Sequence, residues 1–451
     1  MTVTADELGT KDIRKLLIKQ AVPSSIGILF MSLNVVVDTI FVGQWIGSLA
    51  IAAVTVVLPI TILISSLGMA IGVGGGSVFS RALGAKNREK ALFTFGNQIM
   101  MTFLLSSLFV LLGLFFSEEM LLLFGAKGAI MKSAKEFFFP IIITVPFLAL
   151  CMMGNNIIRA EGKAKFAMIA MIIPAFVNIG LDILFIKYLH LGMFGSAMAS
   201  GISYFMCFLF VLWFFLFRSE LKLKARHFKF QIPIIKEITG LSFVTFSRQG
   251  VVSILAIIIN HTLYAYGGEH SIAVYGIVSR MLMFALFPIL GITQGFLPIA
   301  GYNYGASNHD RVKESILISI KYAALIATLI FIGILLFAEP IVAVFTSDSK
   351  VIAETPEALR WVFAASPIIA LQLIGAAYFQ AAGKAKKALF LTLSKQGFFL
   401  IPLVLILPNF FGIFGVWVAF PIADILSTIL TGYFLKKEMN NNLIQNNDGL
   451  L

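Results

Sequence analysis

The sequence predicts an all-α integral membrane protein in which twelve transmembrane helices form two six-helix lobes. Three observations predict this fold: the composition, the length of the apolar runs and an internal repeat. Hydrophobic residues make up 59% of the chain and charged residues 12%, and the mean hydropathy is +0.95. Such a composition leaves too few polar residues to cover a soluble domain.

The apolar runs are long enough to cross a bilayer as helices. A transmembrane helix needs roughly 20 mostly apolar residues, whereas the strands of a membrane barrel alternate polar and apolar residues over about ten. The runs in this chain are continuously apolar, so they predict helices rather than strands. In chain order the predicted spans cover residues 21–45, 50–75, 91–116, 137–158, 166–187, 192–217, 238–265, 271–299, 315–338, 357–380, 387–408 and 411–435.

The net charge of +12 is distributed unevenly along the chain. Lys and Arg concentrate in the N-terminal lead-in and in every second loop, whereas acids such as Glu118 and Glu354 occupy the loops between. Basic residues favour the cytoplasmic side of a membrane, so both termini are predicted to be cytoplasmic, at a bacterial cytoplasmic membrane. The lipid bilayer explains this charge pattern, and no nucleic-acid partner is expected.

The two halves of the chain repeat the same segments at nearly one spacing. LGMAIGVGGGSVFSRALGAKN (67–87) matches LGITQGFLPIAGYNYGASN (290–308), and RAEGKAK (159–165) matches QAAGKAK (380–386) at an offset of 221. The offset spans six helices, an even number, so the halves are predicted to be parallel repeats related by a pseudo-two-fold axis along the membrane normal. We therefore expect three parts: an N-lobe over 1–217, a cytoplasmic linker over 218–237 and a C-lobe over 238–451.

Residues that bend helices occur inside many predicted spans. Proline interrupts the helical hydrogen-bond ladder, and glycine lets neighbouring helices approach closely. Examples are Pro23, Pro288 and the GVGGG stretch at 72–76. Kinked and closely packed helices favour a protein with moving lobes. The alternatives of a different class are a static channel and a membrane scaffold.

Five segments resemble those of the multidrug and toxic compound extrusion (MATE) transporters, in the same order along the chain: VDTIFVG (37–43), GAKNREK (84–90), NIGLDILFI (178–186), GITQGFLPIAGYNYGA (291–306) and QAAGKAK (380–386). The resemblance covers essentially the whole chain. It implies a two-lobed antiporter that exports amphipathic, often cationic small organic compounds in exchange for H+ or Na+, with no other cofactor. Of the two ions we favour H+. Two-lobed antiporters can work alone, so a monomer is expected.

Two aspartates of the N-lobe lie inside predicted spans, where a carboxylate costs a few kcal/mol and usually faces the interior of the bundle. Asp38 and Asp182 each lie about 17 residues from the cytoplasmic end of their span, and therefore at matching depth. Asn34 and Asn178 precede them by four residues, which places amide and carboxyl on one helix face. We predict that these four residues form one polar network.

An acid pair kept away from water can hold a proton near neutral pH and lose it when water or a cation arrives. We expect Asp38 to be the principal coupling residue and Asp182 its partner, so that H+ or Na+ is exchanged for an organic cation. The resemblance adds a fourth-helix asparagine, Asn155 or Asn156, and a sixth-helix hydroxyl, Ser200, to this cation-coupling network.

A structural role is the alternative for the acid pair. In that case the acids would pack helices, and local hydroxyls such as Thr39 would satisfy the carboxylates. The repeat argues against this alternative, because the C-lobe positions that match Asp38 and Asp182 are His261 and Pro402. The symmetry of the fold therefore does not require the pair.

The C-lobe carries a different set of charges within its spans. Arg248, Lys395 and Asp424 each lie about eight to eleven residues from a cytoplasmic helix end. Because a buried cation usually pairs with an acid, we expect a structural ion pair of Asp424 with Lys395, with Arg248 close by. The seventh and tenth spans offer His261 and Gln372 rather than acids, and the resemblance then favours the DinF-like branch of the family.

Methionine and aromatic side chains form adaptable surfaces for varied ligands. In the helices that line the cleft of the resembling family, the substrate-contact candidates are Met31, Met69, Met152, Met171, Phe287 and Tyr302, with core packing as the alternative for each. A cationic substrate would pair such groups with the acids. An anionic or lipid-like substrate would favour Arg280, which we expect to face water.

The sequence lacks the motifs of several enzyme classes. It has no HExxH, no CxxC, no GxGxxG at a strand–helix junction and no phosphate-binding loop. Its histidines show no paired spacing that would suggest a metal site. An enzyme is therefore not expected. The closest alternative function is a lipid-linked oligosaccharide or lipid flippase of the same superfamily, which would line its cavity with basic residues that the N-lobe spans lack.

Overall fold

The computed structural model describes residues 6–346 and 348–443, and over these ranges the chain is helical, without strands. Ten described helices are long and apolar enough to cross a membrane. The longest, α9 (Ile232–Gly305), contains two helices, because the backbone turns at Gly268, where φ is 66°. With the pair α11 (Ser349–Phe363) and α12 (Ser366–Ala381), which is bent by 47°, these helices account for the twelve predicted spans. The all-α membrane fold is thereby confirmed.

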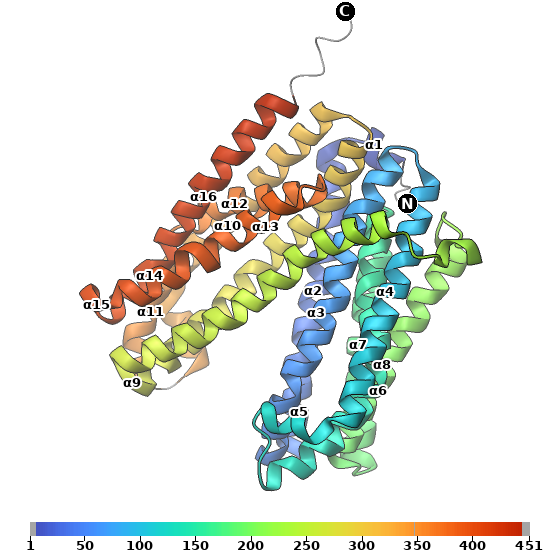
Figure 1. The fold of residues 1–451 in the computed structure, drawn as a ribbon. Helices are drawn as coiled ribbons and strands as arrows, with labels where there is room; N and C mark the ends of the chain where they lie inside the picture. Colours follow the sequence, from blue (N-terminus) through green and yellow to red (C-terminus); the bar gives the residue numbers. More distant parts are fainter. Residues whose placement is uncertain (1–5, 347, 444–451) are drawn as a thin grey trace, which may run out of the picture. The chain divides into compact units, whose positions relative to one another are not determined.

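The first half of the chain supplies long helices that lie side by side (Figure 1). They are α2 (Ile13–Trp45), α3 (Ser48–Gly84), α4 (Arg88–Phe115), α6 (Ala129–Ala160), α7 (Ala164–Asp182) and α8 (Gly192–Trp213). α7 and α8 continue as π-helical turns, and the shorter elements complete this half: α1 (Glu7–Thr10), α5 (Ser117–Leu123), η1 (Ile183–Tyr188), η2 (Phe214–Arg218) and η3 (Ala225–Phe228).

In the second half, α9 turns back on itself (Figure 1). The remaining elements are α10 (His309–Phe345), α13 (Ala385–Leu393), the π-helical η4 (Ser394–Leu400), α14 (Ile401–Ile406), α15 (Pro408–Phe411) and α16 (Ile413–Asn442). Several helices run beyond the predicted spans; α3, for example, continues from the predicted end at 75 to Gly84. The helical hydrogen bonds continue past the apolar run because they do not depend on hydropathy.

The chain divides into two compact units. Unit 1 comprises Ile26–Thr245 together with Asp6 and Glu7, and unit 2 comprises Leu8–Ser25 and the described residues from Phe246 onward. The lobes expected from the repeat meet at a loop, whereas these units divide the chain inside α2 and inside α9. Each of these two helices therefore has one end in unit 1 and the other in unit 2.

The N-terminal part of unit 2 is held by polar side chains of α9 and α10. Arg311 donates from Nη2 to the carbonyl oxygens of Leu8 (3.3 Å) and Lys11 (2.6 Å), and from Nε to Oδ1 of Asn303 (3.0 Å). Asn303 in turn donates from Nδ2 to the carbonyl of Leu8 at 2.9 Å. These bonds fix the start of the N-terminal segment on the rest of unit 2.

The start of α9 is held in unit 1 in a comparable way. Glu237 forms ion pairs with Arg81 at the end of α3 (2.7 Å) and with Lys90 at the start of α4 (3.1 Å). The predicted linker also packs on α4, where Asn97 donates from Nδ2 to the carbonyl of Lys229 at 3.1 Å. The linker is thus part of unit 1 rather than a separate connection.

Glycine residues of α3 allow this helix to lie directly against α6. A Cβ atom built on Gly68 would lie 2.4 Å from the carbonyl oxygen of Ala149, and one on Gly72 would lie 2.9 Å from the Cα of Met153. Both contacts are with backbone atoms, which cannot rotate away. The close packing predicted from the glycine clusters is therefore present between α3 and α6.

The substitution Gly68→Ala is expected to lower the stability of the purified protein by about 1–3 kcal/mol, the usual cost of overpacking. Thermal unfolding in detergent would measure the loss. Gly333→Ala is the matched control, because a Cβ there meets no atom within 4 Å and alanine favours a helix over glycine by up to about 1 kcal/mol. Equal melting temperatures for the two variants would contradict the close approach of α3 and α6.

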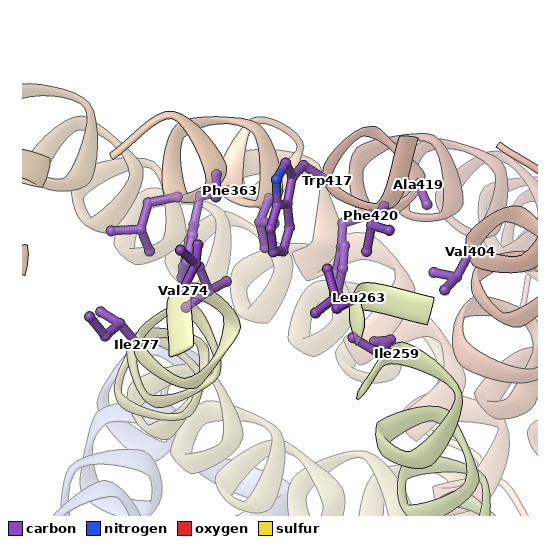
Figure 2. Packing of buried hydrophobic residues seen from close by; sticks show 14 of the residues in the cluster. Ile259, Leu263, Val274, Ile277, Phe363, Val404, Trp417, Ala419 and Phe420 are labelled. Carbon is purple, nitrogen blue, oxygen red and sulfur yellow. The ribbon is translucent and has the colours of Figure 1, made fainter. Parts of the chain in front are cut away.

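The core of unit 2 lies between α9, α10, α11, η4, α14 and α16. Figure 2 shows side chains from α9, among them Leu263 and Val274, facing Phe363 of α11 and Trp417 and Phe420 of α16. Leu263 is completely buried and Phe363 is 1% exposed. This apolar packing supports the helices that carry the charged residues of unit 2.

Candidate functional site

The structure brings Asp38 and Asp182 together inside unit 1. Asp38 lies on α2, and Asp182 is the last residue of α7, directly before the π-helical turn η1. The carboxyl of Asp38 interacts with the carboxyl of Asp182 and with the hydroxyl of Ser196. Asp182 has 0% of its surface exposed, and Asp38 is half-buried. The two acids that were expected at matching depth are therefore neighbours in space.

The proximity of two carboxyl groups limits the charge that this site can hold. Two carboxyls share a hydrogen bond only when one of them carries a proton, because an ionised carboxylate accepts hydrogen bonds but cannot donate them. Two buried carboxylates side by side are costly unless a proton or another cation neutralises one of them. The site can therefore bind one positive charge and release it when water or a second cation gains access.

One face of α8 supplies polar groups to the acid pair. Asn178 of α7 donates from Nδ2 to the hydroxyl of Ser200 at 3.3 Å, and Tyr204 interacts electrostatically with both carboxyls. Ser196, Ser200 and Tyr204 follow one another at intervals of four residues, so they share one face of α8. Ser200 was predicted from the sequence, whereas Ser196 and Tyr204 were not. Their regular spacing in an apolar helix is the signal that could have revealed them.

Asn34 lies one helical turn before Asp38 on α2. Its Oδ1 is buried and accepts no hydrogen bond from any residue in the described part of the chain. The hydroxyl of Thr39, in contrast, donates to the carbonyl of Val35 at 2.8 Å. The packing alternative required Thr39 to donate a hydrogen bond to Asp38. It does not, because its hydroxyl proton is already donated to Val35.

The structure does not bring Asn155 and Asn156 to the acid pair. Asn155 donates from Nδ2 to the carbonyl of Ala167 at 2.6 Å, and Asn156 donates to the carbonyl of Met152 at 2.8 Å. Ala167 lies near the start of α7 and Asp182 at its end, a separation of roughly 22 Å at 1.5 Å per residue. The two asparagines come from the last turns of α6, too far along the bundle from the acids.

The charged residues of unit 2 are arranged partly as expected. Nζ of Lys395 lies 2.7 Å from Oδ1 of Asp424, which is 3% exposed. Arg248 is half-buried and forms no ion pair with a residue in the described ranges. His261 is exposed, and Gln372 donates to the carbonyl of Leu391 at 3.1 Å. The structure therefore joins Asp424 with Lys395 and leaves Arg248 outside this pair.

The substrate-contact candidates fall in both units. Met31, Met69, Met152 and Met171 belong to unit 1, and all four keep some exposed surface. The Sδ atom of Met171 also accepts a hydrogen bond from Nη2 of Arg159 at 3.1 Å. The remaining candidates belong to unit 2, where Phe287 and Tyr302 are each 7% exposed and Arg280 is exposed. Phe287 and Tyr302 thus mainly pack within unit 2, whereas the methionines and Arg280 have free surface.

The turn between α6 and α7, which belongs to the RAEGKAK motif of the repeat, holds a buried cluster outside the membrane-spanning helices. Glu161, which is 2% exposed, accepts a hydrogen bond from the hydroxyl of Ser219 at 2.5 Å. Lys163 lies 3.9 Å from Glu161 and 3.4 Å from Glu220. Burial raises the pKa of Glu161 from its usual 4.5 to about 7, an effect that Ser219 and Lys163 offset only in part.

This buried acid makes the stability of the protein depend on pH. Because the pKa of Glu161 is higher in the folded chain, folding is favoured when the group is protonated, and that contribution is lost as the pH rises from 4.5 to about 7. Its size is at most about 3 kcal/mol. Glu161→Gln is expected to flatten the fall in melting temperature between these pH values. Glu119→Gln, at an exposed acid of α5, is the control; equal pH profiles for both variants would contradict the assignment.

A search with protein-family models found one family, described as MatE, whose model matches residues 23–184 and 247–406. The two matched segments together cover more than half of the chain, and each lies within one half of the internal repeat. Between the described residues, no three His, Cys, Asp or Glu side chains are grouped so that they could hold a metal ion.

Characterised proteins resemble the chain along nearly its whole length. A protein named multidrug export protein MepA, from Staphylococcus haemolyticus (strain JCSC1435), is 27% identical over 424 residues, which is 94% of this chain and 93% of that protein. The crystal structure of MATE in the bent conformation has a TM-score of 0.92 at 25% identity, with 98% of each chain covered. An outward-facing multidrug resistance MATE family transporter of the MOP superfamily has a TM-score of 0.90 at 26% identity, covering 98% of this chain and 99% of that chain.

Proposed function

Because the chain belongs to the MatE family, we propose that it is a cation-coupled antiporter that exports amphipathic, often cationic drugs across the cytoplasmic membrane by alternating access. A relative named multidrug export protein supports this substrate class. That name also favours drug export over the flipping of lipid-linked oligosaccharides. The family is one of transporters, so the chain is not an enzyme.

The observation that carries the proposal is the contact between Asp38 and Asp182. In a membrane-embedded acid pair, one positive charge is needed to neutralise one of the two carboxylates. Such a pair can couple two fluxes, since a cationic drug and a small cation compete for the same negative charge. H+ is the favoured coupling ion, because a proton can neutralise one of two neighbouring carboxyls. Asn178, Ser200, Ser196 and Tyr204 support the pair with hydrogen-bonding groups.

Other features of the chain complete the proposal. The acid pair and its supporting groups all lie in unit 1 of one chain, so the coupling does not need a second copy, and we propose a monomer. The basic residues of alternate loops support a cytoplasmic location of both termini. The DinF-like branch is supported by His261 and Gln372, which the seventh and tenth spans carry in place of acids.

The test is the release of protons when a drug binds. Purified protein in weakly buffered detergent solution is titrated with ethidium, and the proton release is measured with a pH indicator dye. We expect a saturable release of protons by the wild type, because ethidium and H+ compete for the acid pair. A parallel measurement with a sodium electrode tests Na+ as the coupling ion.

The control for this titration is Asp310→Asn, which changes an exposed acid of α10 and should leave the release unchanged. Ethidium binding that releases neither H+ nor Na+ would refute coupling. A large ion current through the protein in planar bilayers, insensitive to Asp38→Asn, would point to a channel instead.

A further inference from the structure

The ion pair of unit 2 borders a small, partly open cavity. The cavity has a volume of about 40 Å³ and is lined by residues of α9, α10, α11, α12, η4 and α16. Apart from Ser366, Lys395 and Asp424, the lining is apolar; it includes Leu282, Ile289, Ile330, Phe363, Ile369 and Phe420. A cavity needs roughly 10–15 Å³ per water, so this one has room for about three waters beside the ion pair.

The stability of the helices does not explain this ion pair. Replacing a buried ion pair by apolar residues of similar size is often neutral or stabilising, and ionisable residues inside a membrane usually serve a function. Two irregular backbone segments also border the cavity. Lys395 lies on the π-helical η4, and Ser366 follows the break where α11 and α12 bend by 47°. Such irregularities are frequent at functional sites.

The dimensions of the cavity exclude most ligands. Drug-sized molecules need pockets of about 300–1,000 Å³, far more than the present space. Hard metal cations are held by several oxygen ligands at once, whereas the side chains of this lining offer the carboxylate of Asp424 and the hydroxyl of Ser366. A proton needs neither a large pocket nor several oxygen ligands, and the few waters that fit in the cavity can deliver it.

We propose that Asp424 and Lys395 form a second proton-binding site, located in unit 2. A proton from water adds to the carboxylate of Asp424, which becomes a neutral acid while Lys395 keeps its charge; on release, the proton returns to water and the ion pair forms again. Among the residues that line the cavity on all six elements, Lys395 is the titratable group that faces Asp424. Protonation therefore changes the net charge of an otherwise apolar cavity by one.

This inference rests on the proposed antiport and would raise the number of protons exchanged per drug. The test measures the affinity of the purified protein for ethidium at several pH values between about 6 and 8, around neutrality. By linkage, each proton released on binding lowers the Kd for ethidium about tenfold for each unit by which the pH rises. The proposal requires that ethidium binding release the proton of Asp424 together with that of the acid pair in unit 1. The Kd of the wild type is then expected to change about a hundredfold per pH unit.

The informative variant is the double substitution Asp424→Leu with Lys395→Met, which replaces the ion pair by apolar side chains of similar size and leaves no unpaired charge. We expect it to fold and to bind ethidium with a tenfold change per pH unit, as one proton is lost. Lys321→Met, at an exposed lysine of α10, is the control. A double variant with the wild-type slope overturns the second site; a wild type with no slope overturns the proposed antiport itself.

Discussion

Asp38→Asn and Asp182→Asn are each expected to slow the cation-driven efflux of ethidium strongly. Both acids contribute to one buried pair, and an asparagine amide cannot take up or release a proton. Without that exchange, the ion gradient no longer drives the export of the drug. We expect the efflux rate to fall by roughly 5- to 150-fold, the range that corresponds to coupling free energies of about 1–3 kcal/mol.

The measurement uses everted membrane vesicles driven first by a proton gradient and then by a sodium gradient, with ethidium fluorescence as the signal. Asp38→Glu is the informative companion, since it keeps an ionisable oxygen pair, and it should retain part of the activity. Expression and melting temperature of each variant control for misfolding. Unchanged efflux and ion dependence in both asparagine variants would show that the acids do not couple transport.

Arg311→Ala is expected to release the start of the N-terminal segment from unit 2 and to lower stability by about 2–5 kcal/mol. The guanidinium donates to the carbonyls of Leu8 and Lys11 and to Asn303, and each buried polar group left without its partner costs about 1–3 kcal/mol. Asn303 keeps one bond to Leu8, so the loss is partial. The expected result is a lower melting temperature together with faster amide exchange over residues 8–25.

Lys313→Ala is the matched control for this prediction, because Lys313 is a basic residue of the same helix turn that forms no ion pair with a described residue. It should leave both the melting temperature and the exchange of residues 8–25 as in the wild type. If Arg311→Ala exchanged in this segment at the wild-type rate, the hydrogen bonds of Arg311 would not be what holds it.

The sequence was sufficient to predict the helices and the two acids, because both signals are local. A run of about 20 apolar residues is the physical requirement for a span, and Asp38 and Asp182 stand out because carboxylates are rare in such runs. The ion pair of Lys395 with Asp424 was predicted in the same way. Charged residues inside spans usually pair with one another, and the C-lobe spans contain few of them.

Other features depend on distances that no single helix reveals. Ser196 and Tyr204 are ordinary residues of an apolar helix until α8 packs against α7, and Asn155 could be placed only to within a few turns by counting along α6. The division of α2 between the two units was equally hidden. The repeat and the loops mark positions in the chain, whereas the units depend on which segments pack together in space.

That division has a mechanical consequence. The chain passes between the units within α2, at Ser25 and Ile26, and within α9, at Thr245 and Phe246. A rotation of one unit against the other cannot be absorbed by slack loops at these points; it has to flex two continuous helical rods. Pro23 already weakens the first rod beside its crossing, so elastic strain during a transport cycle would concentrate there, and the stiffness of that short stretch would help to set how fast the cycle turns over.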